Sequence, residues 1–252
     1  YARAINSLQP PALQEILLPG KSSSTASNWA GFPPGSGYHY SNFGFGIIGC
    51  LIEILSGESF DRYTVNHIFK PLQMDASFVP ADLEHYLDIA VLYEKSGNGK
   101  FYPACDYYPK NCRPLRKVRR HPLGNYYIGP AGAVRTSALD LAKFMLAHLH
   151  RGNYGGVRIL QPATVEQMQQ LQWSGYDSKG ILRETGLGFQ ISDKIFNRRL
   201  TGHAGEACGL VSGMYFDRYS KQGIIFMVNG GYYRLLDSGY TGIEEALIRR
   251  LF

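Results

Sequence analysis

The stretch PGSGYHYSNFGFGIIGCLIEIL, residues 34–55, is the part of the sequence that decides the fold class. Its first half is rich in glycine and polar residues, and its second half is an apolar run. The apolar side chains recur at helical spacing after the polar trio Tyr40, Ser41 and Asn42, which predicts a helix over residues 43–56 with Gly57 as its C-cap. The apolar positions of this helix are Ile47, Ile48, Leu51, Ile54 and Leu55.

The same periodicity predicts three more helices before residue 185. They cover about 59–69, which stops at Pro71, then 136–150 with Thr136 or Ser137 as N-cap, and then 162–172, which opens with Pro162. Residues 75–128 between them are rich in loop signals, and an insertion is predicted at about 94–128. The first part of the chain is therefore expected to form a helical lobe over about 40–150.

After residue 185 the apolar residues begin to recur at every second position, as in a β-strand. Strands are predicted at 188–192, 210–216 and 223–229, and the turn 217–222 joins the last two as an antiparallel hairpin. A closing amphipathic helix is predicted at about 240–251. Helices, then antiparallel strands over about 185–252, then a final helix indicate an α+β fold, with an antiparallel sheet flanked by helices and a helical lobe.

Length and composition favour one globular unit over residues 1–252. A chain of 252 residues that is 44% hydrophobic buries one sizeable core, and its 29 glycines and 13 prolines are spread along the whole length, so no linker is indicated. No apolar run reaches the roughly 18 to 20 residues of a membrane span, and the first residues lack the zones of a signal peptide. Any targeting segment is expected upstream.

The net charge of +6 is concentrated between residues 110 and 120. This tract contains no acidic residue, and the rest of the chain is about neutral. A solvated insertion loop is the favoured interpretation, because Pro114 and Pro122 interrupt any helical face. Contact with an anionic surface is the alternative, and nucleic-acid binding is a third interpretation that is not expected. The residues concerned are Lys110, Arg113, Arg116, Lys117, Arg119 and Arg120.

The four cysteines do not have the spacing of a metal site, so neither a metal nor an organic cofactor is expected. Cys105 and Cys112 lie seven residues apart in a loop rich in proline and tyrosine, which favours a disulfide bond and an oxidising compartment. Cys50 lies within an apolar run and is interpreted as a small core residue.

Two short segments carry the candidate chemistry. Tyr40 and Asn42 lie two residues apart just ahead of an apolar helix, where both side chains can face a cleft, although an ordinary N-cap with a packed tyrosine is also compatible. A tyrosine acts as a general base only when nearby cations lower its pKa from about 10. In the second segment, TGHAGEACG, His203 and Gly205 precede a predicted strand, and the amide of Glu206 could donate to an oxyanion. A simple turn histidine is the alternative there.

Together these segments resemble the serine β-lactamase-like or penicillin-binding family, which includes class C β-lactamases, D-alanyl-D-alanine carboxypeptidases, D-aminopeptidases and esterases. The similarity runs from about residue 29 to 230, and His203-Ala204-Gly205 occupies the place of lysine-threonine-glycine or histidine-x-glycine. The segment 185–189, TGLGF, is similar to the strand entry before that motif. The other matching residues are Pro34, Gly35, Tyr40, Ser41, Asn42, Gly44, Pro71, Leu72, Met74, Ala131, Gly132, Thr136, Ser137, Asp140 and Leu141.

The family's nucleophile motif is S-x-x-K, and no serine of this chain is followed by lysine three residues later. Only 39 residues precede Tyr40, so the nucleophile is expected upstream of Tyr1. A fragment or one chain of a processed enzyme is favoured over a truncated gene. This chain alone is then expected to be inactive, and without its partner segment to expose a sheet edge and an apolar helix face.

The resemblance implies a serine hydrolase that acts through an acyl-enzyme on a peptide, amide, ester or β-lactam bond. Tyr40 would exchange protons, Asn42 would hold the substrate amide, His203 would take the role of the third-motif cation, and Gly205 and Glu206 would bind substrate. Because histidine is largely neutral above about pH 6.5, strong β-lactamase activity is less expected than peptidase or esterase activity. The resemblance also implies a periplasmic, secreted or membrane-associated location on the extracytoplasmic side. A non-catalytic module that binds cell-wall peptides or a protein partner is the alternative.

Overall fold

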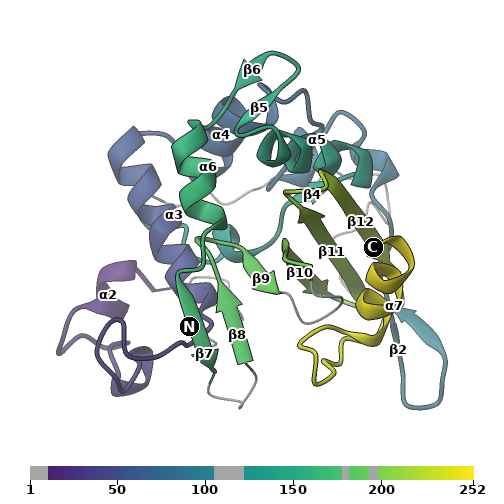
Figure 1. Ribbon diagram of the computed structural model, residues 1–252. Helices are drawn as coiled ribbons and strands as arrows, with labels where there is room; N and C mark the ends of the chain where they lie inside the picture. The colour runs from purple at the N-terminus through teal and green to yellow at the C-terminus, as the bar shows by residue number, and fades with distance from the viewer. Residues whose placement is uncertain (1–10, 105–121, 178–181, 193–197) are drawn as a thin grey trace.

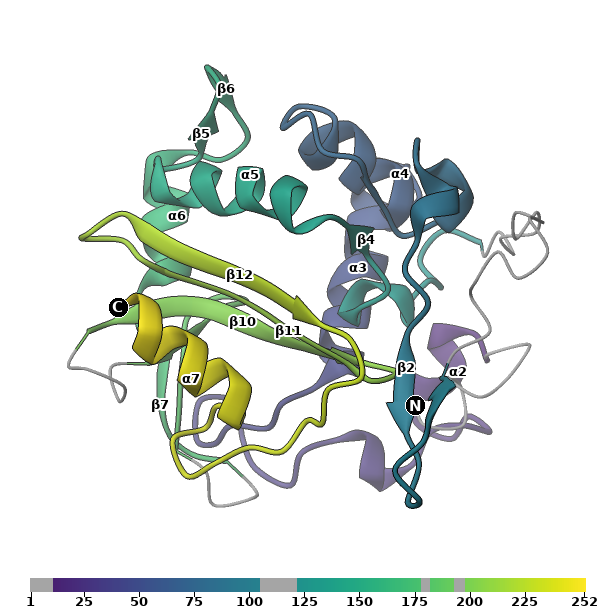
Figure 2. The same ribbon diagram turned by 90° about the vertical axis from the view of Figure 1, so that its right-hand side faces the viewer.

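A six-stranded antiparallel sheet forms the centre of the computed structural model, which describes residues 11–104, 122–177, 182–192 and 198–252. The strand order is β12-β11-β10-β9-β8-β7. Helix α7 covers one face of β10 to β12, and α5 packs against the other face (Figures 1 and 2). The predicted α+β class, with an antiparallel sheet between helices and a helical lobe, is confirmed. The sheet strands are β7 (Trp173–Tyr176), β8 (Leu182–Thr185), β9 (Gln190–Ser192), β10 (Leu200–Ala207), β11 (Leu210–Asp217) and β12 (Gln222–Val228).

The helices of the lobe and short hairpins surround this sheet. Three two-stranded sheets pair β1 with β4, β2 with β3 and β5 with β6. The helices are α2 (Leu13–Leu17), α3 (Asn42–Ser56), α4 (Phe60–Thr64), α5 (Ala138–Leu149), α6 (Pro162–Gln169) and α7 (Gly242–Leu251), with short 3-10 turns at Ala26–Asn28, Pro80–Asp82, Tyr86–Asp88 and Gly129–Ala131. The short strands are β1 (Ala76–Ser77), β2 (Tyr93–Lys95), β3 (Phe101–Pro103), β4 (Arg135–Thr136), β5 (Asn153–Tyr154) and β6 (Val157–Arg158).

Two apolar clusters hold the helices onto the sheet. On the α7 face, Leu200, Val211 and Tyr215 pack with Ile248 of α7. On the opposite face, which α5 covers, Met145 and Leu149 of α5 pack with Phe189, Met214 and Phe216. Because side chains alternate between the two faces of a strand, the same strands serve both clusters. The part of the sheet formed by β10 to β12 is therefore covered on both faces.

Most predicted helices agree with the structure, and the differences have local causes. The helix expected over 59–69 is α4 followed by a π-helical turn over Val65–Phe69, and the helix expected over 162–172 ends at Gln169. Residues 203–205 precede strand β11 as predicted, but they themselves lie inside β10, which was not predicted. Strands β7 and β8 were not predicted at all.

The outer face of α3 is apolar and exposed. Ile48, Leu51, Ile54 and Leu55 are between 50% and 85% exposed, whereas the buried face of this helix consists of Gly46, Gly49, Cys50 and Glu53. Strand β12 forms one edge of the sheet. The exposed sheet edge and exposed apolar helix face that the sequence predicts are therefore both present within the described residues.

No single helix in the described part of the chain has the length and apolar character to cross a membrane. The pair Asn42–Ser56 and Phe60–Phe69, bent by 81°, passes that test by length and composition only. Among the same residues, no group of three or more His, Cys, Asp and Glu side chains could hold a metal ion.

Candidate active site

The Tyr40 to Asn42 turn lies at the N-terminus of α3. Ser41, not Asn42, caps the helix, because its side chain accepts a hydrogen bond from the amide of Gly44 at 2.9 Å. Tyr40 is 50% exposed and thus is not a packed core residue. Neither Tyr40 nor Asn42 is needed to cap the helix, and both are available for chemistry at the surface.

His203 lies inside β10, which excludes the interpretation as a simple turn residue. It pairs with Met214 of β11. The turn comes five residues later, at Cys208 and Gly209, whose φ angles of 50° and 81° suit a two-residue hairpin. Since Met214 belongs to the cluster on the α5 face, the side chain of His203 lies on that face too.

One side of β10 is open to a ligand beyond Gly202. In a two-residue hairpin, Ala207 and Leu210 exchange both backbone hydrogen bonds, so the alternate residues Ala204 and Glu206 direct their N–H and C=O groups away from β11. Strand β9 pairs only with Leu200–Gly202. Within the described residues, the amide of Glu206 therefore lies on a free strand edge, where a peptide backbone or an oxyanion can reach it.

Gly205 is required by close cross-strand packing. A Cβ at this position would lie 2.5 Å from Oγ of Ser212, and Ser212 also donates a hydrogen bond to the Gly205 carbonyl at 3.3 Å. A side chain at this position would require the Ser212 hydroxyl to rotate away and lose its hydrogen bond to the Gly205 carbonyl.

The structure brings Tyr40 and His203 together across the gap between the lobe and the sheet. Their ring centroids lie 6.3 Å apart, with 39° between the ring planes. Nδ1 of His203 lies 2.5 Å from the carbonyl oxygen of Ala204, so it must carry a proton and donate it. A neutral His203 then has its lone pair on Nε2, which is the form that accepts a proton or a hydrogen bond.

Burial raises the pKa of Tyr40 above its usual value of 10. The phenol is consequently protonated at neutral pH and acts as a donor in this chain. For Tyr40 to work as a base, a cation would have to lower its pKa. This agrees with the expectation from the sequence that the tyrosine needs a positive partner.

Two further tyrosines that the sequence analysis did not select border this site. The pKa of Tyr233 is raised to about 12, chiefly by burial and also by Glu244, Glu206 and Tyr40, while Arg183 acts in the lowering direction. Burial also raises the pKa of Tyr38. The charge of Arg183 acts to lower this pKa, and Tyr40 acts to raise it. Both phenols thus interact electrostatically with Tyr40 and Arg183. No spacing or motif in the sequence indicated them.

Other predicted features fall elsewhere. Cys50 is a buried free cysteine in α3 whose pKa rises to about 11, chiefly by burial, as expected for a core residue. The predicted Cys105–Cys112 bridge and the basic tract with Arg113, Arg116, Lys117, Arg119 and Arg120 lie outside the described residues.

Comparisons with known proteins give a consistent result. The family model described as Beta-lactamase matches residues 23–247. The chain is 27% identical over 141 residues to penicillin-binding protein 4 of Amycolatopsis lactamdurans, which covers 55% of this chain and 33% of that protein. It is 34% identical over 73 residues to a D-aminopeptidase of Cereibacter sphaeroides, which covers 29% of this chain and 14% of that protein.

Among solved structures, the octameric penicillin-binding protein homologue from Pyrococcus abyssi aligns with a TM-score of 0.63 at 25% identity. The alignment covers 87% of this chain and 43% of that one. The chain thus spans about a third or less of the curated relatives that it matches, and under half of this structural neighbour.

Proposed function

The chain belongs to the beta-lactamase family, and from this premise we propose that it is part of a serine hydrolase that acts through an acyl-enzyme. The observation that carries the proposal is the approach of Tyr40 to His203, 6.3 Å apart beside the open edge of β10. The nucleophilic serine and its lysine come from a segment upstream of Tyr1. The reaction class is hydrolysis or transfer at a peptide, amide, ester or β-lactam bond.

Each side chain has a distinct role in this proposal. The serine attacks the carbonyl carbon, and the lysine of the upstream segment supplies the cation that the buried Tyr40 phenol needs before it can exchange protons. Asn42 holds the substrate amide, and His203 orients the substrate and supports Tyr40. The strand-edge amide of Glu206 donates to the oxyanion, and Gly205 lets the substrate backbone lie against the sheet edge.

The upstream segment would also cover two uncovered surfaces of the chain, one apolar helix face and one strand edge. We propose that it covers the outer face of α3 and pairs with the edge strand β12, either as part of one polypeptide or as a companion chain. We also propose a location on the extracytoplasmic side of a membrane, because the resemblance implies peptide substrates of the cell wall.

An intact-mass measurement on the full-length protein tests the proposal. Incubation with a penicillin or a fluorophosphonate probe is expected to add one covalent adduct. Tyr40→Phe is expected to slow its formation by about 10²- to 10⁴-fold, because general acid–base catalysis contributes that much. Tyr219→Phe, a 71% exposed tyrosine at the β11–β12 turn, is the matched control and should react like the wild type.

A full-length protein that has the upstream serine and yet forms no adduct would overturn the hydrolase proposal. Binding of cell-wall peptides without an adduct would then favour the non-catalytic module.

A further inference from the structure

We propose that Asn229, the residue after β12, is a positioning residue that fixes the β10–β11 turn and thereby the amide of Glu206. The inference rests on the proposed function, in which this amide donates to the oxyanion. Asn229 contacts neither the substrate nor the reacting atoms in this role. It acts by holding the β2–β3 hairpin against the end of the sheet.

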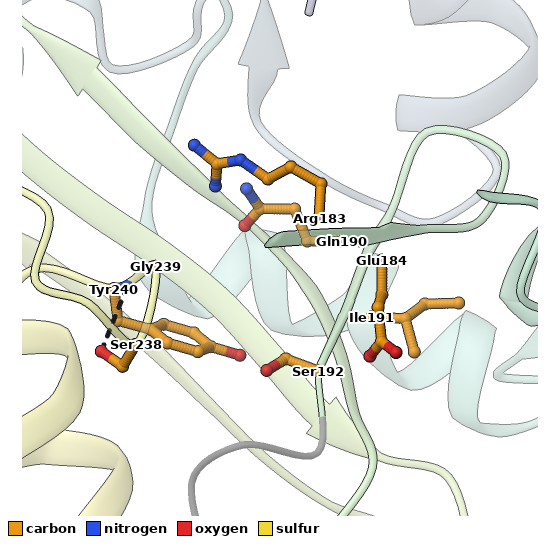
Figure 3. Close-up of a pocket in the computed structure, with 8 residues that line it drawn as sticks. All are labelled: Arg183, Glu184, Gln190, Ile191, Ser192, Ser238, Gly239 and Tyr240. Carbon is orange, nitrogen blue, oxygen red and sulfur yellow. Dashed lines mark hydrogen bonds between the residues drawn. The ribbon is translucent and has the colours of Figure 1, made fainter. Parts of the chain in front are cut away.

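The part of β10 that carries Glu206 has a neighbouring strand on one side only. Gln190, labelled in Figure 3 among the residues that line a small pocket, is the outermost residue of β9 to pair with β10, and its partner is Gly202. Beyond Gly202, the described residues pair β10 with β11 alone. The end of an edge strand opens more easily than the centre of a sheet, because fewer contacts hold it. The position of the Glu206 amide therefore depends on what holds the β10–β11 turn.

Asn229 lies at the same end of the sheet as Glu206. Glu206 pairs with Val211, and Val211 pairs with Val228, so one row of residues crosses β10, β11 and β12. Asn229 comes one residue after this row. Neighbouring strands lie about 5 Å apart, so the row is only about 10 Å wide. A contact made by Asn229 thus supports the end of the sheet that carries the Glu206 amide.

The carboxamide of Asn229 makes two hydrogen bonds to backbone groups that lie 138 and 136 residues earlier in the chain. Its Nδ2 donates to the Val91 carbonyl at 2.7 Å, and its Oδ1 accepts from the Tyr93 amide at 2.9 Å. A carboxamide has both a donor and an acceptor, so it can pair with an extended segment as a backbone peptide does. Asn229 in this way holds the start of β2 at the end of the sheet, where Figure 2 shows β2 beside the ends of β10 and β11.

The same backbone segment contacts the β10–β11 turn. A Cβ on Gly209, in the turn, would overlap the Tyr93 carbonyl oxygen and lie 3.2 Å from Cγ of Glu94, so the two backbones are in close contact. The Gly209 carbonyl also accepts a hydrogen bond from the Gly231 amide at 2.8 Å. The turn is therefore held both by β2 and by the segment after β12. Asn229 connects these two supports, since it bonds to β2 and lies two residues before Gly231.

The kinetics of acylation of the full-length protein by a penicillin test this role. Asn229→Ala is expected to lower the acylation rate constant about 10-fold, which is part of the 10²- to 10³-fold loss that removal of an oxyanion donor causes. The dissociation constant of the non-covalent complex should change less than about twofold, because the donor acts on charge that develops only in the transition state. A change in that dissociation constant larger than the change in the rate constant would contradict a positioning role.

Hydrogen exchange of the same protein is a measurement that does not depend on catalysis. In Asn229→Ala, the backbone amides of residues 204–209 are expected to exchange about 10-fold faster, because the two hydrogen bonds that hold β2 against the turn are lost. The acceleration should be smaller for residues 213–216 in the middle of β11. Equal acceleration of both segments would indicate a general loss of stability and would count against the inference.

Two further variants exclude such a general loss of stability. Asn125→Ala is the matched control, because it removes a bond of the same kind within the lobe, where Asn125 accepts from the Leu13 amide at 2.9 Å. It should leave both measurements unchanged. Asn229→Asp keeps the acceptor for the Tyr93 amide and loses the donor, so a smaller effect than that of Asn229→Ala is expected in each measurement. If Asn229→Ala does not fold, Asn229→Asp decides the question, and equal effects of the variants at 125 and 229 would overturn the inference.

The two measurements separate this inference from the proposed function. If the wild type forms no covalent adduct but exchange at residues 204–209 still rises in Asn229→Ala, Asn229 fixes the turn and only the hydrolase proposal fails. If the wild type forms an adduct and Asn229→Ala is acylated at the same rate, only the positioning role fails. Unchanged exchange at residues 204–209 in Asn229→Ala overturns the inference in either case.

Discussion

His148 of α5 is an ionisable residue enclosed by aromatic rings. It is 2% exposed, neither ring nitrogen has a hydrogen-bond partner in the described structure, and the rings of Phe144, Phe189 and Phe216 lie 4.7, 5.0 and 6.5 Å away. Burial lowers its pKa to about 4. Above pH 6.5 the residue is neutral in both the folded and the unfolded chain, so it has no pH-dependent effect on stability there.

As the pH falls from 6.5 to 4, the unfolded chain binds a proton at His148 and the folded chain does not. The free energy of unfolding should therefore decrease by about 3 kcal/mol from this residue alone. His148→Leu is expected to remove this component, so that the variant becomes progressively more stable than the wild type towards pH 4. Denaturant unfolding at several pH values measures the difference.

His150→Gln removes a histidine two residues away at an exposed position and is the matched control. Its stability should follow the wild type at every pH. A difference between His148→Leu and the wild type that does not vary between pH 6.5 and 4 would contradict the assignment.

At this scale, motifs could predict part of the candidate site. Tyr40, Asn42 and His203 were found from local patterns and their order, and the structure brings Tyr40 and His203 together. Tyr233 could not be found in the same way. Its electrostatic coupling to Tyr40 arises from tertiary packing of the segment after β12, which no single-sequence spacing encodes.

Helix α3 is held against the rest of the lobe by a close approach of two backbones. A Cβ on Gly46 would lie 1.9 Å from the carbonyl oxygen of Tyr127, so Gly46→Ala requires α3 to move. We expect it to lower the free energy of unfolding by about 1–3 kcal/mol despite the higher helix propensity of alanine. Gly44→Ala in the same helix is the control, because its Cβ would meet only ordinary contacts at 3.5 Å.

Thermal unfolding of both variants measures the comparison. Gly44→Ala should be neutral or stabilising by up to about 1 kcal/mol. Equal melting temperatures for the two variants would show that Gly46 is not a contact point. Because α3 begins at Asn42, a displaced α3 should also change the approach of Tyr40 to His203.

Helices with a strong apolar periodicity could be predicted from the sequence. Strands that depend on backbone pairing with a neighbouring strand could not. Helices α3 and α5 have clear apolar periodicity and serine N-caps, and their bounds agree with the prediction within two residues. Strand β10 was not predicted, because Gly202, Ala204 and Gly205 have low strand propensity. Its extended form is imposed by seven paired positions on β11.

At the scale of the whole molecule, the order of helical and strand periodicities along the sequence was sufficient to predict the fold class. Helices followed by antiparallel strands and a closing helix predicted the α+β sheet that α5 and α7 cover. The same reasoning predicted an exposed sheet edge and an exposed helix face. The sequence did not indicate which residues form that face, because α3 is apolar on more than one side.

The outer face of α3 should make the isolated chain self-associate. Leu55 is 85% exposed and Leu51 is 50% exposed, in a row with Ile48 and Ile54, and apolar patches of this kind are uncommon on monomeric proteins. The double variant Leu51→Lys with Leu55→Lys is expected to shift the chain towards monomer in sedimentation velocity. Its free energy of unfolding should change by no more than about 0.5 kcal/mol, because surface substitutions rarely do more.

Leu87→Lys, also an exposed leucine at 55% but located in a short 3-10 turn away from α3, is the matched control and should associate like the wild type. If the double variant still associates as strongly, the edge strand β12 must be responsible instead. In that case Met227→Lys, which places a charge on this edge strand, should restore the monomer because a charge on an edge strand opposes pairing between copies. The two variants thus distinguish self-association through the α3 face from self-association through pairing of β12. The surface through which the chain self-associates is the one that a partner segment must cover.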